Sequence, residues 1–152
     1  MNMQIINKPA FAVVGMKIHT SPQEGDFPGL WRRFGPRMHE IQHVVAPETS
    51  YGLSTNWDET TGKFDYIAAM QVDSTEDLPE GMVSLQIPAQ TYAVFPAKLS
   101  TISETYDQIH SQWLSAAGRR RASGPDFEYY DEQFNPDDPE SEFHLYVPIG
   151  AA

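Results

Sequence analysis

Apolar and polar residues alternate along short stretches that divide the chain into two similar halves. In the first half, the apolar run of residues 11–18 leads through a Ser-, Pro- and Gly-rich loop to a helical stretch from about Leu30 to Val45. Two strand-like runs, "SYGLS" and "FDYIAAMQV", follow and are separated by the turn-rich "NWDETTGK". The first half is therefore predicted to have the order β-α-β-β.

The second half repeats this order. A strand over residues 92–98 precedes a helix that opens at Thr101, because Thr101 and Glu104 have the spacing of a capping box. Two further strands are predicted in "DFEYYDEQF" and "EFHLYVPI". The apolar positions of the helix recur at intervals of four, three and four, which places them on one helical face: Ile102, Tyr106, Ile109 and Trp113.

The two halves are also related in sequence. The string "KPAFAVVGMK" near the start corresponds to "AQTYAVFPAK" in the second half, with Phe11 aligned on Tyr92. Each half covers one face of its sheet with its own helix and needs the other half to complete a core. We therefore predict an α+β fold. It is expected to be one domain of residues 1–152, in which two pseudo-symmetric β-α-β-β repeats (about 4–73 and 83–150) form antiparallel sheets with helices packed on them.

Composition and charge limit the classes of function. A formal net charge of −11 disfavours direct binding to nucleic acid or to anionic membrane surfaces. The absence of cysteine excludes disulfides and thiolate metal sites. No signal peptide or membrane span is recognisable, so a cytoplasmic protein is expected. The basic cluster of residues 119–121 is interpreted as positive charge that follows a helix end at Gly118.

Eight short sequence motifs are spread over nearly the whole chain. Together they point to a protein family more specifically than any one of them does alone. The second half carries "IPAQTYAVFPAK", "ISETYDQIHSQWL", "PDFEYYD" and "YVPI", and the first carries "VVGMK", "LWRRF", "YGLS" and "FDYIAAMQV". Together they resemble the GyrI-like (gyrase-inhibitor-like) effector-binding family, as in the effector domains of AraC-type and MerR-type multidrug-sensing regulators. The resemblance implies a central hydrophobic ligand pocket, no cofactor, and a pocket carboxylate that recognises small cationic, often aromatic, molecules.

The residues that would form this pocket follow from the resemblance and from strand geometry. The family's "P-x-F-E-x-Y" pattern falls on Glu128, and the aromatic residue before the terminal "V-P-I" is Tyr146. A period of two puts Glu128 and Tyr130 on one side of their strand, and a hairpin with the last strand would bring Glu128 near Tyr130, His144 or Tyr146. The predicted ligand-binding residues are Glu128, Tyr146, Tyr130, Trp113, Trp31, Phe34, Tyr66 and Tyr51.

Two alternatives stand beside this interpretation. Glu128 lies in an acidic segment and could be a solvated strand residue, and aromatic residues at helical spacing are often core residues.

A carboxylate surrounded by aromatic rings is energetically costly unless it takes up a proton or accepts a cation. A buried Glu128 would therefore select positively charged ligands, and aromatic faces would add cation–π contacts.

Residues 39–43 read "HEIQH" and match the H-E-x-x-H zinc motif. On a helical wheel, both histidines point away from the apolar stripe that contains Ile41. The metzincin continuation is missing, since Ala46 and Thr49 replace its glycine and histidine, and Pro47 ends the helix. We therefore predict that the motif is the tail of the first helix and that it holds no metal.

These features favour a stand-alone protein that captures cationic, amphiphilic aromatic compounds at Glu128, as a sensor or sequestering module. The first strand begins within about ten residues of Met1, so no DNA-reading domain is expected before it. A transcriptional role would then require a separate regulatory protein. One alternative is hydrolysis of reactive small molecules, with Glu128 as the catalytic residue that directs water. Another is binding to a topoisomerase subunit. The sequence predicts neither the natural ligand nor the oligomeric state.

Overall fold

The computed structural model describes residues 3–113, 119–122, 124–135 and 137–151, with side chains at all of these except residues 110, 113, 119, 120 and 151. Its strands are β1 (Gln4–Lys8), β2 (Phe11–Thr20), β3 (Ser50–Asp58), β4 (Lys63–Val72), β5 (Val83–Ile87), β6 (Gln90–Lys98), β7 (Arg119–Arg121), β8 (Asp126–Tyr130) and β9 (Glu142–Ala151). Its helices are α1 (Phe27–Phe34) and α2 (Ile102–Gln108). They are extended by the short helical segments η1 (Gly35–Glu40), η2 (Leu99–Thr101) and η3 (Ile109–Trp113).

The order of these elements confirms two β-α-β-β repeats, β2-α1-β3-β4 and β6-α2-β8-β9. Two short strands that the sequence pattern did not predict, β1 and β5, each precede one repeat. β1 pairs antiparallel with β6, and β5 pairs antiparallel with β2, so each extra strand joins the sheet of the other repeat. The result is an α+β fold in which the two halves exchange strands.

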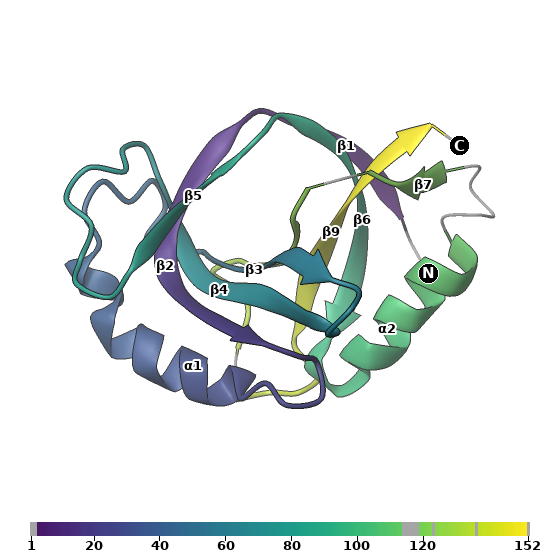
Figure 1. The fold of residues 1–152 in the computed structure, drawn as a ribbon, viewed down its shortest axis with the longest axis horizontal. Helices are drawn as coiled ribbons and strands as arrows, with labels where there is room; N and C mark the ends of the chain where they lie inside the picture. Colours follow the sequence, from purple (N-terminus) through teal and green to yellow (C-terminus); the bar gives the residue numbers. More distant parts are fainter. Residues whose placement is uncertain (1–2, 114–118, 123, 136, 152) are drawn as a thin grey trace.

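Two short connections, Pro9-Ala10 and Pro88-Ala89, close the sheet into a ring. Lys8 pairs with Gln90 at the end of β1, and Phe11 pairs with Ile87 at the start of β2, so one antiparallel register runs through both connections. The described strand order is β1-β6-β9-β8-β3-β4-β2-β5, so the bent β1–β2 segment runs from β1 at one end to β2, which pairs with β5 at the other end. Figure 1 shows this ring, with the two bent segments side by side at the top.

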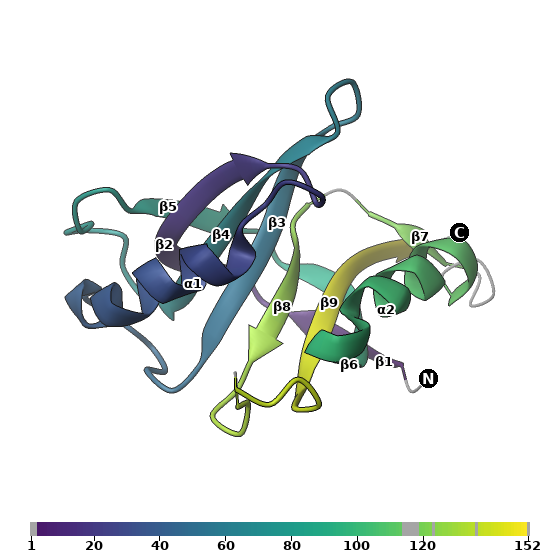
Figure 2. The same ribbon diagram turned by 90° about the horizontal axis from the view of Figure 1, so that it is seen from below.

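The ring has an inner and an outer apolar face. The inner cluster draws residues from both repeats, among them Leu53 and Phe127. On the outer face, Leu30 and Phe34 of α1 pack on β2 and β4, and Ile109 at the end of α2 packs on β6 and β9. Figure 2 shows both helices on the outside, with β3 and β8 between them. The helices thus frame the seam at which the two repeats meet.

The first helical segment ends earlier than predicted. α1 stops at Phe34, a 3-10 segment continues to Glu40, and Ile41 is already extended, with φ −75° and ψ 126°. Pro36 explains the change, because proline has no N–H to donate to a carbonyl one turn earlier. Ile41 is buried as predicted, whereas Val45 is 51% exposed. The prediction that all of "HEIQH" lies in a helix is therefore wrong.

The second helix begins where the capping pattern places it, directly after Thr101. The Thr101 side chain makes no capping hydrogen bond in the described structure, and Thr105 Oγ1 instead donates to the Thr101 carbonyl oxygen at 3.0 Å. Residues 119–121 form β7, which pairs with β9, and the helix end predicted at Gly118 lies outside the described residues. None of the described helices is long and apolar enough to cross a membrane.

Candidate ligand-binding site

Glu128 lies in the middle of β8, at the seam that the two helices frame. Its exposed fraction is 8%, and the two-residue period of the strand places Asp126 and Tyr130 on the same side. Tyr130 belongs to the apolar cluster under α2, so this side of β8 is the outer, helix-covered face. The alternative interpretation of Glu128 as a solvated strand residue is therefore wrong.

A chain of hydrogen bonds joins α1 to this carboxylate. Tyr66 Oη donates to Glu128 Oε1 at 2.8 Å, and Tyr130 Oη donates to the same oxygen at 2.6 Å. Trp31 Nε1 in turn donates to Tyr66 Oη at 3.1 Å. Three elements thus converge on one group: β8 carries Glu128 and Tyr130, β4 carries Tyr66, and α1 carries Trp31. The two phenols that donate to Glu128 are neutral, so they stabilise the carboxylate without supplying a positive charge.

Aromatic rings enclose the same region. The Trp31 and Tyr130 rings meet edge to face, with centroids 5.6 Å apart, and Trp31 makes a similar contact with Phe34 at 5.9 Å. Trp31 is partly buried and packs against both outer clusters, so it bridges the cores under α1 and α2. The structure therefore brings together five of the predicted residues: Glu128, Tyr130, Trp31, Phe34 and Tyr66.

Gly52 makes room for this arrangement and was missed by sequence reasoning. It pairs with Glu128 across β3 and β8. A Cβ atom at this position would lie 2.2 Å from Tyr66 Oη and 2.6 Å from Glu128 Oε1. A glycine inside a strand is a known sign of close approach by another group, and "YGLS" carried that sign.

Burial dominates the electrostatics of the site. It raises the pKa of Glu128 to about 7; the hydrogen bonds from Tyr130 and Tyr66 oppose this shift, and the charge of Asp126 adds to it. Burial, followed by the charge of Glu128, also raises the pKa values of Tyr66 and Tyr130 well above the ordinary value for a phenol. The phenols therefore remain donors while Glu128 exchanges its proton near neutral pH.

Two predicted site residues lie on the other face of the sheet. In the register of β8 and β9, Glu128 is opposite Leu145, while Phe127 is opposite Tyr146 and stacks on it with centroids 4.7 Å apart. Of the three neighbours predicted for Glu128, Tyr130 is confirmed. Tyr146 and His144 lie on the other face, because a shift of one residue in register exchanges the two faces.

Tyr51 shares this inner face with Tyr146. It pairs with Tyr129 across β3 and β8, and the ring centroids are 5.2 Å apart. The Trp113 side chain lies outside the described part of the structure, although its backbone ends the segment η3. Tyr51 and Tyr146 are thus separated from Glu128 by the sheet itself.

Two surface hollows lie elsewhere. One of about 370 Å³ is lined by residues such as Met38, Ile41 and Met70, and one of about 470 Å³ by residues that include Phe11 and Gln71. Glu128 lines neither hollow, in keeping with its low exposure. The carboxylate is therefore covered in this conformation. A ligand larger than water reaches it only if the aromatic cover, the rings of Trp31 and Tyr130, moves.

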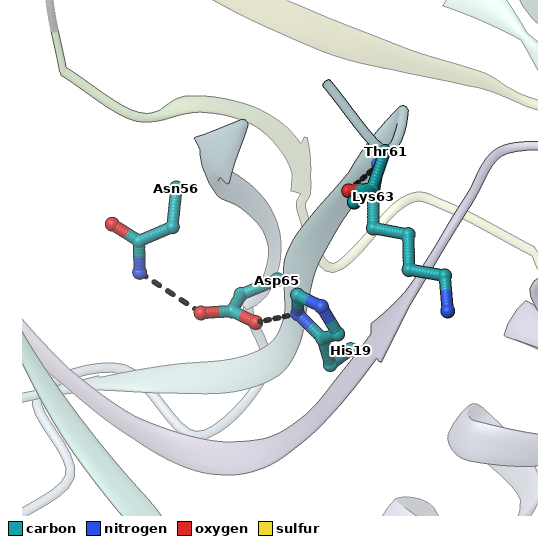
Figure 3. Close-up of polar contacts among 5 residues, drawn as sticks. All are labelled: His19, Asn56, Thr61, Lys63 and Asp65. Carbon is teal, nitrogen blue, oxygen red and sulfur yellow. Dashed lines mark hydrogen bonds and ion pairs between the residues drawn. The ribbon is translucent and has the colours of Figure 1, made fainter. Parts of the chain in front are cut away.

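The histidine motif and the other polar clusters are at the surface. His39 is exposed, and Glu40 accepts two hydrogen bonds from the Arg37 guanidinium, at 2.8 and 3.0 Å. Figure 3 shows a separate cluster on β2, β3 and β4, where His19 Nδ1 lies 2.8 Å from Asp65 Oδ1 and Asn56 Nδ2 donates to Asp65 Oδ2 at 2.9 Å. Among the described residues, no group of three His, Cys, Asp or Glu side chains could hold a metal ion.

Comparisons with known proteins agree with this fold. The chain belongs to the family of integron-associated effector-binding proteins, whose model matches residues 4–149, and it has the GyrI-like effector-binding fold. It is 43% identical to the transcriptional regulator BrlR of Pseudomonas aeruginosa over 152 residues. That match covers 98% of this chain but 56% of the length of BrlR.

Solved structures show the same fold. SAV2435 bound to tetraphenylphosphonium superposes with a TM-score of 0.77 at 18% identity, over 99% of this chain and 94% of the other. The integron cassette protein VCH_CASS2 from the mobile metagenome of Vibrio cholerae gives a TM-score of 0.68 at 23% identity, over 97% and 95% of the two chains. At these identities the likeness establishes the fold.

Proposed function

We propose that this effector-binding domain takes up organic cations, and that Glu128 is the group that recognises their charge. The observation that carries the proposal is a carboxylate with 8% exposure whose described hydrogen-bond donors are both neutral phenols. A further support is the fold it shares with SAV2435, whose structure contains the cation tetraphenylphosphonium.

The physical basis of selection is charge balance in a buried site. An ionised carboxylate in an apolar region is unfavourable without a counter-charge, which is why Glu128 holds a proton near neutral pH. An organic cation can replace that proton and restore neutrality. The rings of Trp31 and Tyr130 would then contact the cation, each contributing about 0.5–2 kcal/mol through cation–π attraction. A neutral molecule of the same shape gains none of these terms.

Entry of a ligand requires the cover to open. Trp31 contacts both outer clusters and is hydrogen-bonded to Tyr66, so a ligand that inserts beside Glu128 must separate Trp31 from Tyr130. Movement of α1 relative to the α2 side would therefore accompany binding. Such a change supplies two states that a regulatory partner could distinguish, in line with the similarity to a transcriptional regulator.

Calorimetric titration with tetraphenylphosphonium at pH 8 tests this function. The wild-type protein is expected to bind, and Glu128→Gln to bind about 30-fold or more weakly, because truncating one partner of a buried charge pair costs about 2–5 kcal/mol. Glu132→Gln is the matched control, since it removes the same charge from an exposed residue just beyond β8. Equal affinity of Glu128→Gln and wild type, or no binding by either, would contradict the proposal.

A further inference from the structure

A second carboxylate lies beside Glu128 on the same strand. Asp126 is two residues earlier in β8, so its side chain points to the same outer face. Both groups are buried, with exposed fractions of 6% for Asp126 and 8% for Glu128. Two buried carboxylates at alternate positions of one strand give the site more negative charge than one monovalent cation can balance.

Arg121 supplies a positive charge to one of these carboxylates. Its Nη2 atom lies 3.6 Å from Asp126 Oδ1. The guanidinium is held in place by its own loop, because Nη1 donates to the Ala122 carbonyl oxygen at 2.9 Å and Nη2 donates to the Gly124 carbonyl oxygen at 3.0 Å. Glu128, in contrast, is hydrogen-bonded by phenols. Asp126 thus has a cation of the chain beside it, the Arg121 guanidinium. The described hydrogen-bond donors to Glu128 are uncharged.

The three charged groups act on a common region under α2. The phenol of Tyr106, on that helix, has a raised pKa for three reasons: burial first, then the charge of Glu128, then that of Asp126, while the charge of Arg121 opposes the shift. Tyr106 packs against the same outer cluster as Tyr130. A ligand seated between Glu128 and α2 would therefore experience the charges of Asp126 and Arg121 as well.

We propose that Asp126 and Arg121 set the charge selectivity of the site: Arg121 neutralises Asp126, so that ligands with one positive charge are preferred over ligands with two. This inference rests on the proposed function, since it describes which cations the Glu128 site accepts. Without the guanidinium, Asp126 becomes a second attachment point for positive charge. Without the carboxylate, the guanidinium repels any second charge on the ligand.

Two nearly isosteric probes test the inference: the monocation 1-methyl-4-phenylpyridinium and the dication 1,1′-dimethyl-4,4′-bipyridinium. Their dissociation constants are measured at pH 8.5, above the pKa of Glu128, for wild type and four variants. Arg121→Gln is expected to shift the ratio of affinities toward the dication by about tenfold, and Asp126→Asn to shift it toward the monocation by a similar factor. Arg121→Lys and the double variant Arg121→Gln/Asp126→Asn should stay near the wild-type ratio.

The outcomes separate this inference from the proposed function. If wild type binds the monocation through Glu128 but Arg121→Gln and Asp126→Asn both leave the ratio within twofold of wild type, the charge-selectivity inference is wrong and the proposed function stands. If both variants shift the ratio in the same direction, the inference is also wrong. If Arg121→Gln does not fold, the shift in Asp126→Asn decides, since that change removes a buried charge. If wild type binds neither probe, the proposed function itself is wrong.

Discussion

The Gly52→Ala variant is expected to lose a large part of its stability. The alanine Cβ would lie 2.2 Å from Tyr66 Oη and 2.6 Å from Glu128 Oε1. Because β3 is hydrogen-bonded on both sides, to β4 and to β8, the clash must be relieved by moving Tyr66 or Glu128, which breaks the hydrogen bond between them. Overpacking of this kind costs about 1–3 kcal/mol, and urea denaturation measures it.

A double variant shows whether this clash is the cause. Tyr66→Phe removes the hydroxyl oxygen, which is the atom nearest to the added methyl group. The cost of Gly52→Ala should therefore be smaller in the Tyr66→Phe background than in the wild-type background. An equal cost in both backgrounds, or a cost below about 0.5 kcal/mol in wild type, would mean that Gly52 does not hold the space at the site.

Stability is expected to fall as the pH rises from 5 to 8, and Glu128 is the reason. Its pKa in the folded protein is about 7, above the ordinary value of 4.5, so folding favours the protonated form. A raised carboxyl pKa contributes stability that is fully present below the unfolded pKa and is lost as the pH rises through the folded value. For this shift, the free energy of unfolding should decrease by about 2–3 kcal/mol between pH 5 and pH 8.

The Glu128→Gln variant isolates this contribution. Glutamine does not titrate. The unfolding free energy of wild type minus that of the variant should therefore fall by about 2–3 kcal/mol between pH 5 and pH 8. Groups that titrate in both proteins cancel in this difference. Saturating tetraphenylphosphonium should reverse the decrease in wild type, because a bound cation stabilises the ionised carboxylate. Parallel pH curves for the two proteins without ligand would contradict the raised pKa.

Much of the fold was accessible from the sequence because periodicity reports which face of an element is buried. The β-α-β-β order, the strands β3 and β4 and the burial of Ile41 all followed from it. The exchanged strands β1 and β5 did not, because they are short, partly exposed and paired with the other repeat, so their stability depends on contacts that local patterns do not report. The early end of the first helix does have a local sign, Pro36, which cannot donate a helical hydrogen bond.

The site was predictable where one strand decided it and unpredictable where two strands had to be aligned. The period of β8 alone put Glu128 and Tyr130 on one face, and the structure joins them by a hydrogen bond. The assignment of Tyr146 to that face required the register between β8 and β9, which alternation does not fix, and a shift of one residue reversed it. The ion pair of Arg121 with Asp126 was not predictable either, since it depends on the loop that brings the two residues together.

The proposed function requires Glu128 to exchange its proton for an organic cation. Calorimetric titrations with tetraphenylphosphonium at pH 6, repeated in buffers of different ionisation enthalpy, count the protons released on binding. With a folded-state pKa of about 7, we expect close to one proton released per ligand at pH 6, almost none at pH 8.5, and none at either pH for Glu128→Gln. Binding at pH 6 without proton release, or the same release from Glu128→Gln, would contradict it.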